Sequence, residues 1–235
     1  MGANQQLIMS HKAAGGSVTI TRVTSSVTTN NTSNSSTIST PSFNAASGNL
    51  IVVGVAWGVG DGATDVTLAD TVGNTYTKVG TVTFNESSQS RLTLFYRLSS
   101  AAQTGNVVTA TFTTNVSFPA GIYAVQYNTS SGSWSYDGTG TVSASGDYAT
   151  NPLTSASFST ANKGVISLFA ANHYYANTNT SSFTGETNLT AATHPSVIWA
   201  AERITSAAQS STTVSATVSA GDTRLGLWAG SFTVA

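Results

Sequence analysis

The feature that most constrains the fold is a phrase that the chain carries twice. Residues 97–109 read RLSSAAQTGNVVT and residues 203–215 read RITSAAQSSTTVS, at an offset of 106 residues. Upstream, SFNAASGNLIVVGVA (42–56) resembles SFSTANKGVISLFAA (157–171), now at an offset of 115. Self-similarity of this kind is typical of duplicated structural units. The repeat therefore predicts two related halves, at about 42–128 and 157–234.

The local pattern of both halves is alternation with period two, rich in Val, Ile, Thr and aromatic residues, which indicates β-strands. No window predicts an amphipathic helix. A polar, low-complexity stretch at 25–40 is expected to be an exposed loop, and Asp70–Asn74 is expected to form a hairpin turn because Gly73 and Asn74 tolerate positive φ. Strands are expected near 17–24, 49–57, 75–84, 90–98, 106–114, 121–127, 164–171, 196–204, 212–219 and 224–234.

The fold class expected is all-β: a two-sheet antiparallel β-sandwich, jelly-roll-like, built from an internal duplication. Two arrangements fit. Each half closes its own small sandwich, or both halves contribute strands to one. The second is favoured because NLIVVGVAW, GVISLFAA and LGLWAGSF are apolar on both faces, as in strands covered on both sides. Residues 1–16 are expected to be an extended N-terminal arm outside a single domain at 17–235.

Composition excludes several classes of protein. Only 7% of the 235 residues are charged and the formal net charge is -1, so no basic field is available to hold nucleic acid. Hydrophobic residues reach 40%, which favours a folded chain over a disordered one. There is no cysteine for disulfides, no apolar run long enough to span a membrane, and no secretory signal in the sequence as it stands.

Several phrases give the chain a family resemblance: SGNLIVVGVAW, DTVGNTYTKV, GNVVTATFT, IYAVQY and LGLWAGSFTV, which together cover most of 42–234. They resemble a group of uncharacterised β-sandwich domains found among bacteriophage structural proteins and bacterial surface proteins. The resemblance implies a jelly-roll-like sandwich with a particle-surface or adhesive role. It carries no known catalytic residues.

The sequence contains few residues in patterns typical of catalysis or metal binding. The three histidines, His11, His173 and His194, lie in polar stretches, and no G-x-S-x-G elbow supports a catalytic triad. No catalytic residue and no cofactor is therefore predicted. Glu202, beside Arg203, is expected on a strand surface. Asp61, Asp65 and Asp70 are weak candidates for calcium, since their spacing matches no EF-hand and Asp is also a common turn residue.

Aromatic residues offer a candidate ligand site. Trp134, Tyr136, Tyr174 and Tyr175 lie in stretches rich in Gly, Asn and Ser. Such rings serve as a platform for sugars, as anchors of a protein interface, or, most simply for Trp134 and Tyr136, as core side chains. The other tryptophans, at positions 57, 199 and 228, are expected in the core.

These features lead to a functional hypothesis. The chain is expected to be a structural component of a bacteriophage particle, such as a capsid decoration, cement or fibre-like protein, assembled in the host cytoplasm. Its expected partners are other virion proteins, such as a major capsid protein, and further copies of itself, with a trimer favoured. Leu7, Ile8 and Met9 of the arm are expected to dock on a neighbouring subunit. The alternative is a carbohydrate-binding or host-adhesion module that binds a host glycan.

Overall fold

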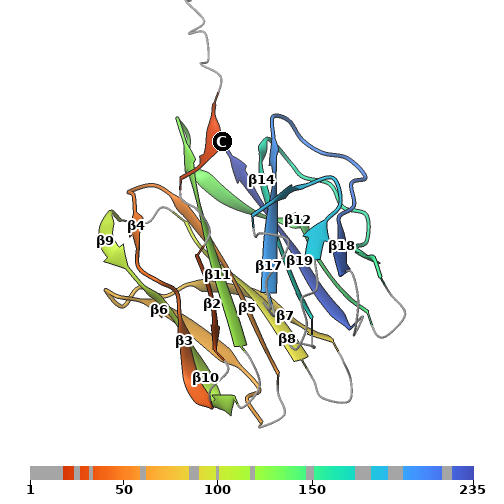
Figure 1. The fold of residues 1–235 in the computed structure, drawn as a ribbon. Coiled ribbons are helices and arrows are strands. Elements are labelled where there is room, and N and C mark those ends of the chain that lie inside the picture. The colour runs from red at the N-terminus through yellow and green to blue at the C-terminus, as the bar shows by residue number, and fades with distance from the viewer. Residues whose placement is uncertain are drawn as a thin grey trace, which may run out of the picture.

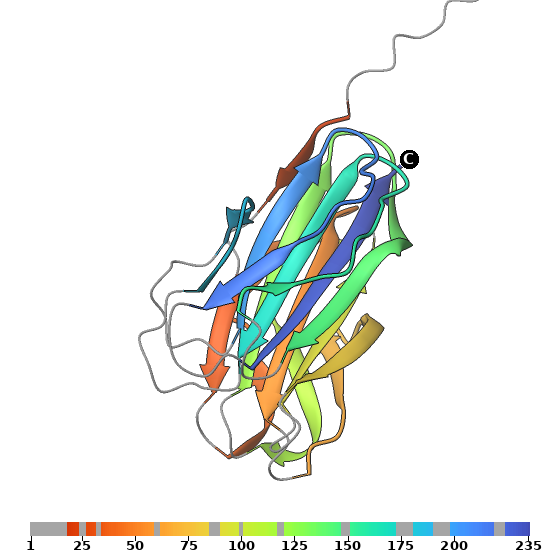
Figure 2. The same cartoon turned by 90° about the vertical axis from the view of Figure 1, so that its right-hand side faces the viewer.

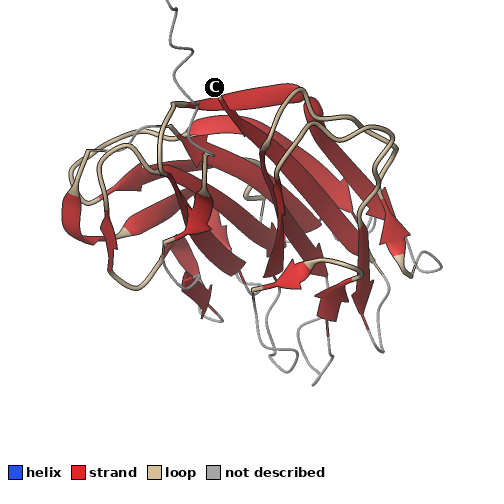
Figure 3. Cartoon of the chain, turned by 90° about the horizontal axis from the view of Figure 1, so that it is seen from above, coloured by secondary structure: helices blue, strands red, loops and turns tan. Residues whose placement is uncertain are grey.

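The computed structural model describes residues 18–23, 27–31, 34–58, 62–84, 90–98, 101–116, 120–146, 151–172, 181–189, 198–218 and 224–235. These residues form strands and no helix, as the view from above shows (Figure 3). No segment among them is therefore a helix that could cross a membrane. All strand pairs in the sheets are antiparallel, which confirms the all-β sandwich class predicted from the sequence.

The first half of the chain forms two sheets and a small ribbon. Its inner sheet has the order β1-β11-β5-β8-β7, with β2 also on β11, and consists of β1 (Ile20–Arg22), β2 (Val27–Asn31), β5 (Leu50–Gly58), β7 (Thr77–Phe84), β8 (Ser90–Arg97) and β11 (Ala120–Thr129). Its outer sheet consists of β3 (Ser35–Ser39), β10 (Val108–Val116) and β6 (Val66–Asp70). The ribbon pairs β4 (Phe43–Ala45) with β9 (Gln103–Asn106).

The second half repeats this plan. Its inner sheet has the order β12-β19-β14-β17-β16 and consists of β12 (Trp134–Gly146), β14 (Gly164–Asn172), β16 (Thr187–Asn188), β17 (Ile198–Thr205) and β19 (Leu225–Val234). Its outer sheet consists of β13 (Leu153–Thr154), β18 (Ser215–Val218) and β15 (Ser181–Phe183). A single bridge between Phe158 and Thr212 replaces the ribbon of the first half.

The sheets stack in four layers: outer, inner, inner, outer (Figures 1 and 2). Three separate hydrophobic clusters fill the spaces between them. One lies inside the first sandwich, one inside the second, and the largest group of aromatic side chains lies between the two inner sheets. We call this last contact the central interface. It buries Tyr123, Phe169 and Phe232 completely, so the two sandwiches share one continuous core layer.

The arrangement differs from the single interleaved sandwich favoured by the sequence. Among the described residues no sheet combines strands of the two halves, so each half closes its own sandwich, which was the alternative arrangement. The observation behind the prediction holds, because β5, β14 and β19 are buried along almost their whole length. Its cause is the central interface: these strands lie in inner sheets, with one face on each of two cores.

The duplication is visible in the registers of the strand pairs. Ile51 pairs with Arg97 in the first half, and Ile166 pairs with Arg203 in the second. The same two offsets relate the outer sheets, where the pairs Ser39–Thr109 and Thr154–Ser215 correspond. Equivalent residues can therefore be compared position by position.

Of two local predictions, the loop needs correction and the turn is observed. The stretch 25–40 was expected to be a loop, but it contains β2 and β3, because Thr favours strands and Ile38 supplies a buried side chain to the first core. The turn at Asp70–Asn74 exists, with Gly73 at φ 81° and its amide donating to the carbonyl of Asp70. An antiparallel bridge between Ala69 and Thr75 flanks the turn, as in a short hairpin, and the chain then continues into β7, which belongs to a different sheet from β6.

Candidate functional site

The central interface carries two sets of three side chains at equivalent positions, one on each side of it. Arg22 pairs with Tyr127 between β1 and β11, just as Tyr136 pairs with Phe232 between β12 and β19. Tyr96 and Glu202, which precede the two arginines of the repeated phrase, complete the sets. We call Tyr96, Tyr136 and Phe232 the aromatic triad, and Arg22, Tyr127 and Glu202 the ionic triad.

The aromatic triad joins the halves by ring contacts. The rings of Tyr96 and Tyr136 are stacked with centroids 4.9 Å apart, and Phe232 meets them at 5.3 and 5.8 Å. Phe232 is completely buried, whereas both tyrosines are partly exposed. Ring pairs in this distance range add about 0.5–1.5 kcal/mol to the burial of their apolar surface. This side of the interface is therefore closed by apolar packing.

The ionic triad joins the halves by polar contacts. Nη1 of Arg22 donates to Oε1 of Glu202 at 3.1 Å, and the hydroxyl of Tyr127 lies 3.2 Å from that of Ser167. The Glu202 side chain is only 7% exposed, and its Oε2 has no hydrogen-bond partner. Burial raises the pKa of this carboxyl, and the nearby Arg22 charge opposes that shift. The sequence-based expectation of a surface Glu202 is therefore wrong.

A surface pocket opens near the ionic triad. It has a volume of about 330 Å³ and is lined by Val18, Thr19, Ile20, Ile204, Thr205 and Ser206. Ile20 belongs to the core of the central interface, while Ile204 is 44% exposed. The pocket thus lies between the start of β1 and the end of β17, where the two halves meet at the surface.

The repeated phrase itself marks a structural ion pair in each half. Nη1 of Arg97 lies 2.6 Å from Oδ2 of Asp70, and Nε of Arg203 donates to Oε2 of Glu186 at 3.0 Å. Both acidic side chains are almost completely buried. Asp70 also accepts hydrogen bonds from Asn74, which holds the turn. The duplicated arginines are therefore part of the architecture.

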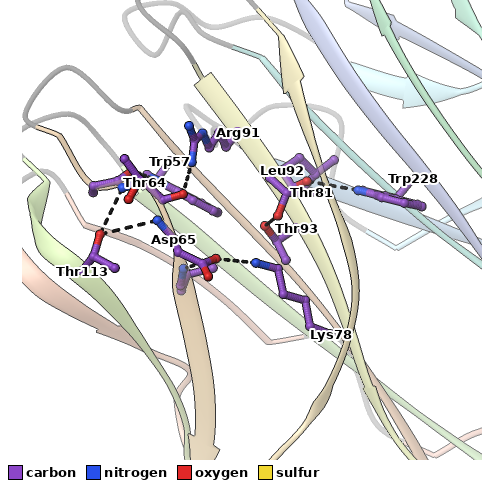
Figure 4. Close-up of polar contacts among 12 residues, drawn as sticks. Trp57, Thr64, Asp65, Lys78, Thr81, Arg91, Leu92, Thr93, Thr113 and Trp228 are labelled. Carbon is purple, nitrogen blue, oxygen red and sulfur yellow. Dashed lines mark hydrogen bonds and ion pairs between the residues drawn. The ribbon is translucent and has the colours of Figure 1, made fainter.

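The candidate calcium ligands have other partners. Lys78 pairs with Asp65, and the Thr64 and Asp65 amides donate to the hydroxyl of Thr113 (Figure 4). The hydrogen bond from Lys78 is the main cause of the lowered pKa of Asp65. Asp70 is paired with Arg97, as described above, and Asp61 lies outside the described residues. Within the described ranges no three acidic or histidine side chains form a group that could hold a metal ion.

The candidate aromatic ligands separate into two groups. Trp134 is 5% exposed and packs against Tyr127, so its ring faces the core, which was the simplest of the three interpretations and excludes a surface platform. Tyr136 belongs to the aromatic triad. Tyr174 and Tyr175 lie outside the described residues, as do Leu7, Ile8 and Met9 and all three histidines. Trp57, Trp199 and Trp228 lie in the core, as the sequence predicts.

The two outer sheets present uncharged hydroxyl groups at equivalent positions. On the first half Thr111 lies beside Thr67, and on the second Thr217 lies beside Ser182. The hydroxyls of Ser39 and Thr109 are 2.8 Å apart, and those of their equivalents, Thr154 and Ser215, are 2.7 Å apart. The two outer sheets therefore carry the same kind of side chain, a small hydroxyl group, at these positions, and none of these residues is charged.

Comparison with protein-family models, curated proteins and solved structures found no match. In the described part of the chain, the carboxylates of Asp70, Glu186 and Glu202 are buried in ion pairs with arginines, whereas Asp65 pairs with Lys78 at the surface. Sequence reasoning missed the ionic triad. A single acid in the apolar strand IWAAERIT was the available signal, because an isolated charge is rarely buried without a partner.

Proposed function

We propose that this chain is a structural component of a virus particle, of the decoration, cement or fibre-like kind, that acts through protein–protein contacts. The observation that carries the proposal is the pair of outer faces. Both present small hydroxyl side chains at matched positions, including Thr67 and Thr111 on one and Ser182 and Thr217 on the other. Uncharged surfaces promote association between proteins, since no electrostatic repulsion opposes it.

The distribution of charge supports the same proposal. Only 7% of the residues are charged, and several of these charged side chains are buried inside the fold. Asp70, Glu186 and Glu202 have side chains that are at most 7% exposed, each facing an arginine. The resemblance to bacteriophage structural proteins adds the particle as the setting, with a major capsid protein and further copies of the chain as partners.

The mass of the full chain in solution tests this proposal. Light scattering is expected to give a stable cyclic oligomer, with a trimer favoured, that persists on dilution into the micromolar range. Replacing Thr67 and Thr111 by Glu should dissociate it by charging one outer face, whereas Val72→Glu, on an exposed turn, serves as the matched control. A monomer that binds glycans, and loses them in Tyr174→Ala/Tyr175→Ala, would contradict the proposal and support the adhesion alternative.

A further inference from the structure

The pocket beside the ionic triad corresponds to a filled position on the other side of the central interface. Ile20 pairs with Thr129 on β11, and Trp134 pairs with Val234 on β19, at equivalent points of the two inner sheets. Trp134 is buried there and contacts the ring of Tyr127. The fold thus has two equivalent places at the edge of the central interface: Trp134 occupies one, and at the other the smaller Ile20 lines the pocket.

The neighbouring residues show the effect of this difference. Leu98 is equivalent to Ile204 in the repeated phrase, and it is partly buried against the core of the central interface. Ile204 instead is 44% exposed and lines the pocket. An apolar side chain placed in the pocket would cover Ile204 and remove its surface from water, at about 25 cal/mol per Å² of apolar area.

The N-terminal segment is the part of the chain that is positioned to provide this side chain. Residues 1–17 lie outside the described residues and lead directly into Val18, which is part of the pocket wall. Their apolar cluster is Leu7, Ile8 and Met9, and the residues between it and Val18 include Gly15 and Gly16. Glycine permits a chain reversal, and a short tether gives an effective concentration on the order of millimolar.

We propose that the pocket is the docking site of the chain's own N-terminal segment, with Leu7, Ile8 and Met9 in the place that Trp134 fills on the other side. The tether favours the segment of the same chain over that of a second copy at micromolar protein concentration. This inference is independent of the proposed structural role, because it concerns the isolated chain and not its oligomer.

Cleavage by trypsin after Lys12 tests the docking. Cleavage of a docked segment requires it to open first, so its rate follows the open population. We expect Ile20→Trp to fill the pocket, as Trp134 does, and to expel the segment. Cleavage at Lys12 should then be about tenfold faster than in the unmodified chain. The triple variant Leu7→Ser/Ile8→Ser/Met9→Ser should show the same acceleration, and Val72→Ser should show none.

Two outcomes would overturn the inference. Equal cleavage rates in the unmodified chain and the triple variant would mean that the pocket does not hold the segment. Protection that disappears on a hundredfold dilution would place the segment of a second copy there instead. The triple variant leaves every described residue unchanged, so the test does not depend on how well Ile20→Trp folds. The oligomer mass is measured separately, which keeps failure of the proposed function distinguishable.

Discussion

The aromatic triad and the ionic triad occupy equivalent positions on the two sides of the central interface, with different chemistry. Tyr96 and Tyr136 stack on one side, and Glu202 and Arg22 form an ion pair on the other. The strand registers that position the two pairs are the same. The backbone of the duplicated sheet therefore does not dictate how the halves are joined. The side chains determine how the halves are joined, and ring stacking and ion pairing differ in the free energy that burial requires.

The free-energy cost differs because rings and carboxylates lose different amounts of hydration when they are buried. Stacked rings are released from water without losing hydrogen bonds, whereas a buried carboxylate loses its hydration and recovers it only in part. On the ionic side Oε2 of Glu202 remains without a partner. The ionic triad is thus expected to hold the halves less tightly and to respond to pH, while the aromatic triad is expected to do neither.

The largest effect is expected from truncating the aromatic triad. Phe232→Ala removes a completely buried ring that contacts both Tyr96 and Tyr136. The free energy of unfolding should fall by about 3–5 kcal/mol, because a cavity is left in the core that both halves share. Urea unfolding followed by tryptophan fluorescence measures it. A loss below about 1 kcal/mol would contradict the assignment of this ring to the shared core.

A smaller loss is expected from breaking the ion pair. Arg22→Ala leaves the Glu202 carboxylate buried and unpaired, and should cost about 1–3 kcal/mol. The loss stays below that of a fully buried pair because the Arg22 side chain is 35% exposed. The double variant Arg22→Tyr/Glu202→Tyr installs the chemistry of the aromatic side and should recover most of the loss. A double variant as unstable as Arg22→Ala would show that the two sides are not interchangeable.

The smallest effect is expected in the pH dependence. Burial raises the pKa of Glu202 above its ordinary value of 4.5, so the folded state holds this proton more tightly than the unfolded state. Stability from this group therefore falls as the pH rises from 4.5 through the raised pKa. The unfolding free energy of the unmodified chain should decline relative to Glu202→Gln across that window. A constant difference between the two would exclude the shift.

Much of the fold could be predicted from the sequence, because the pattern of apolar and polar side chains along a strand reflects which of its faces are buried. Alternation located the long strands, and the repeated phrase identified the halves and their equivalent arginines. The continuous apolar character of LGLWAGSFTV also indicated a strand covered on both faces. Each of these patterns is visible within a short stretch of sequence, so the strands could be predicted without knowing which residues contact one another across the fold.

The tertiary structure alone decided how the halves meet. Whether two apolar sheet faces cover each other or share a sandwich depends on residues far apart in the chain, and both arrangements bury the same strands. Arg22 and Glu202 are 180 positions apart, and no local pattern shows that they pair. For Trp134 the sequence left a surface platform and a core position open, and the register of β12 turns its ring into the core. Long-range packing therefore determined the two triads and the pocket, while the sequence determined the strands that carry them.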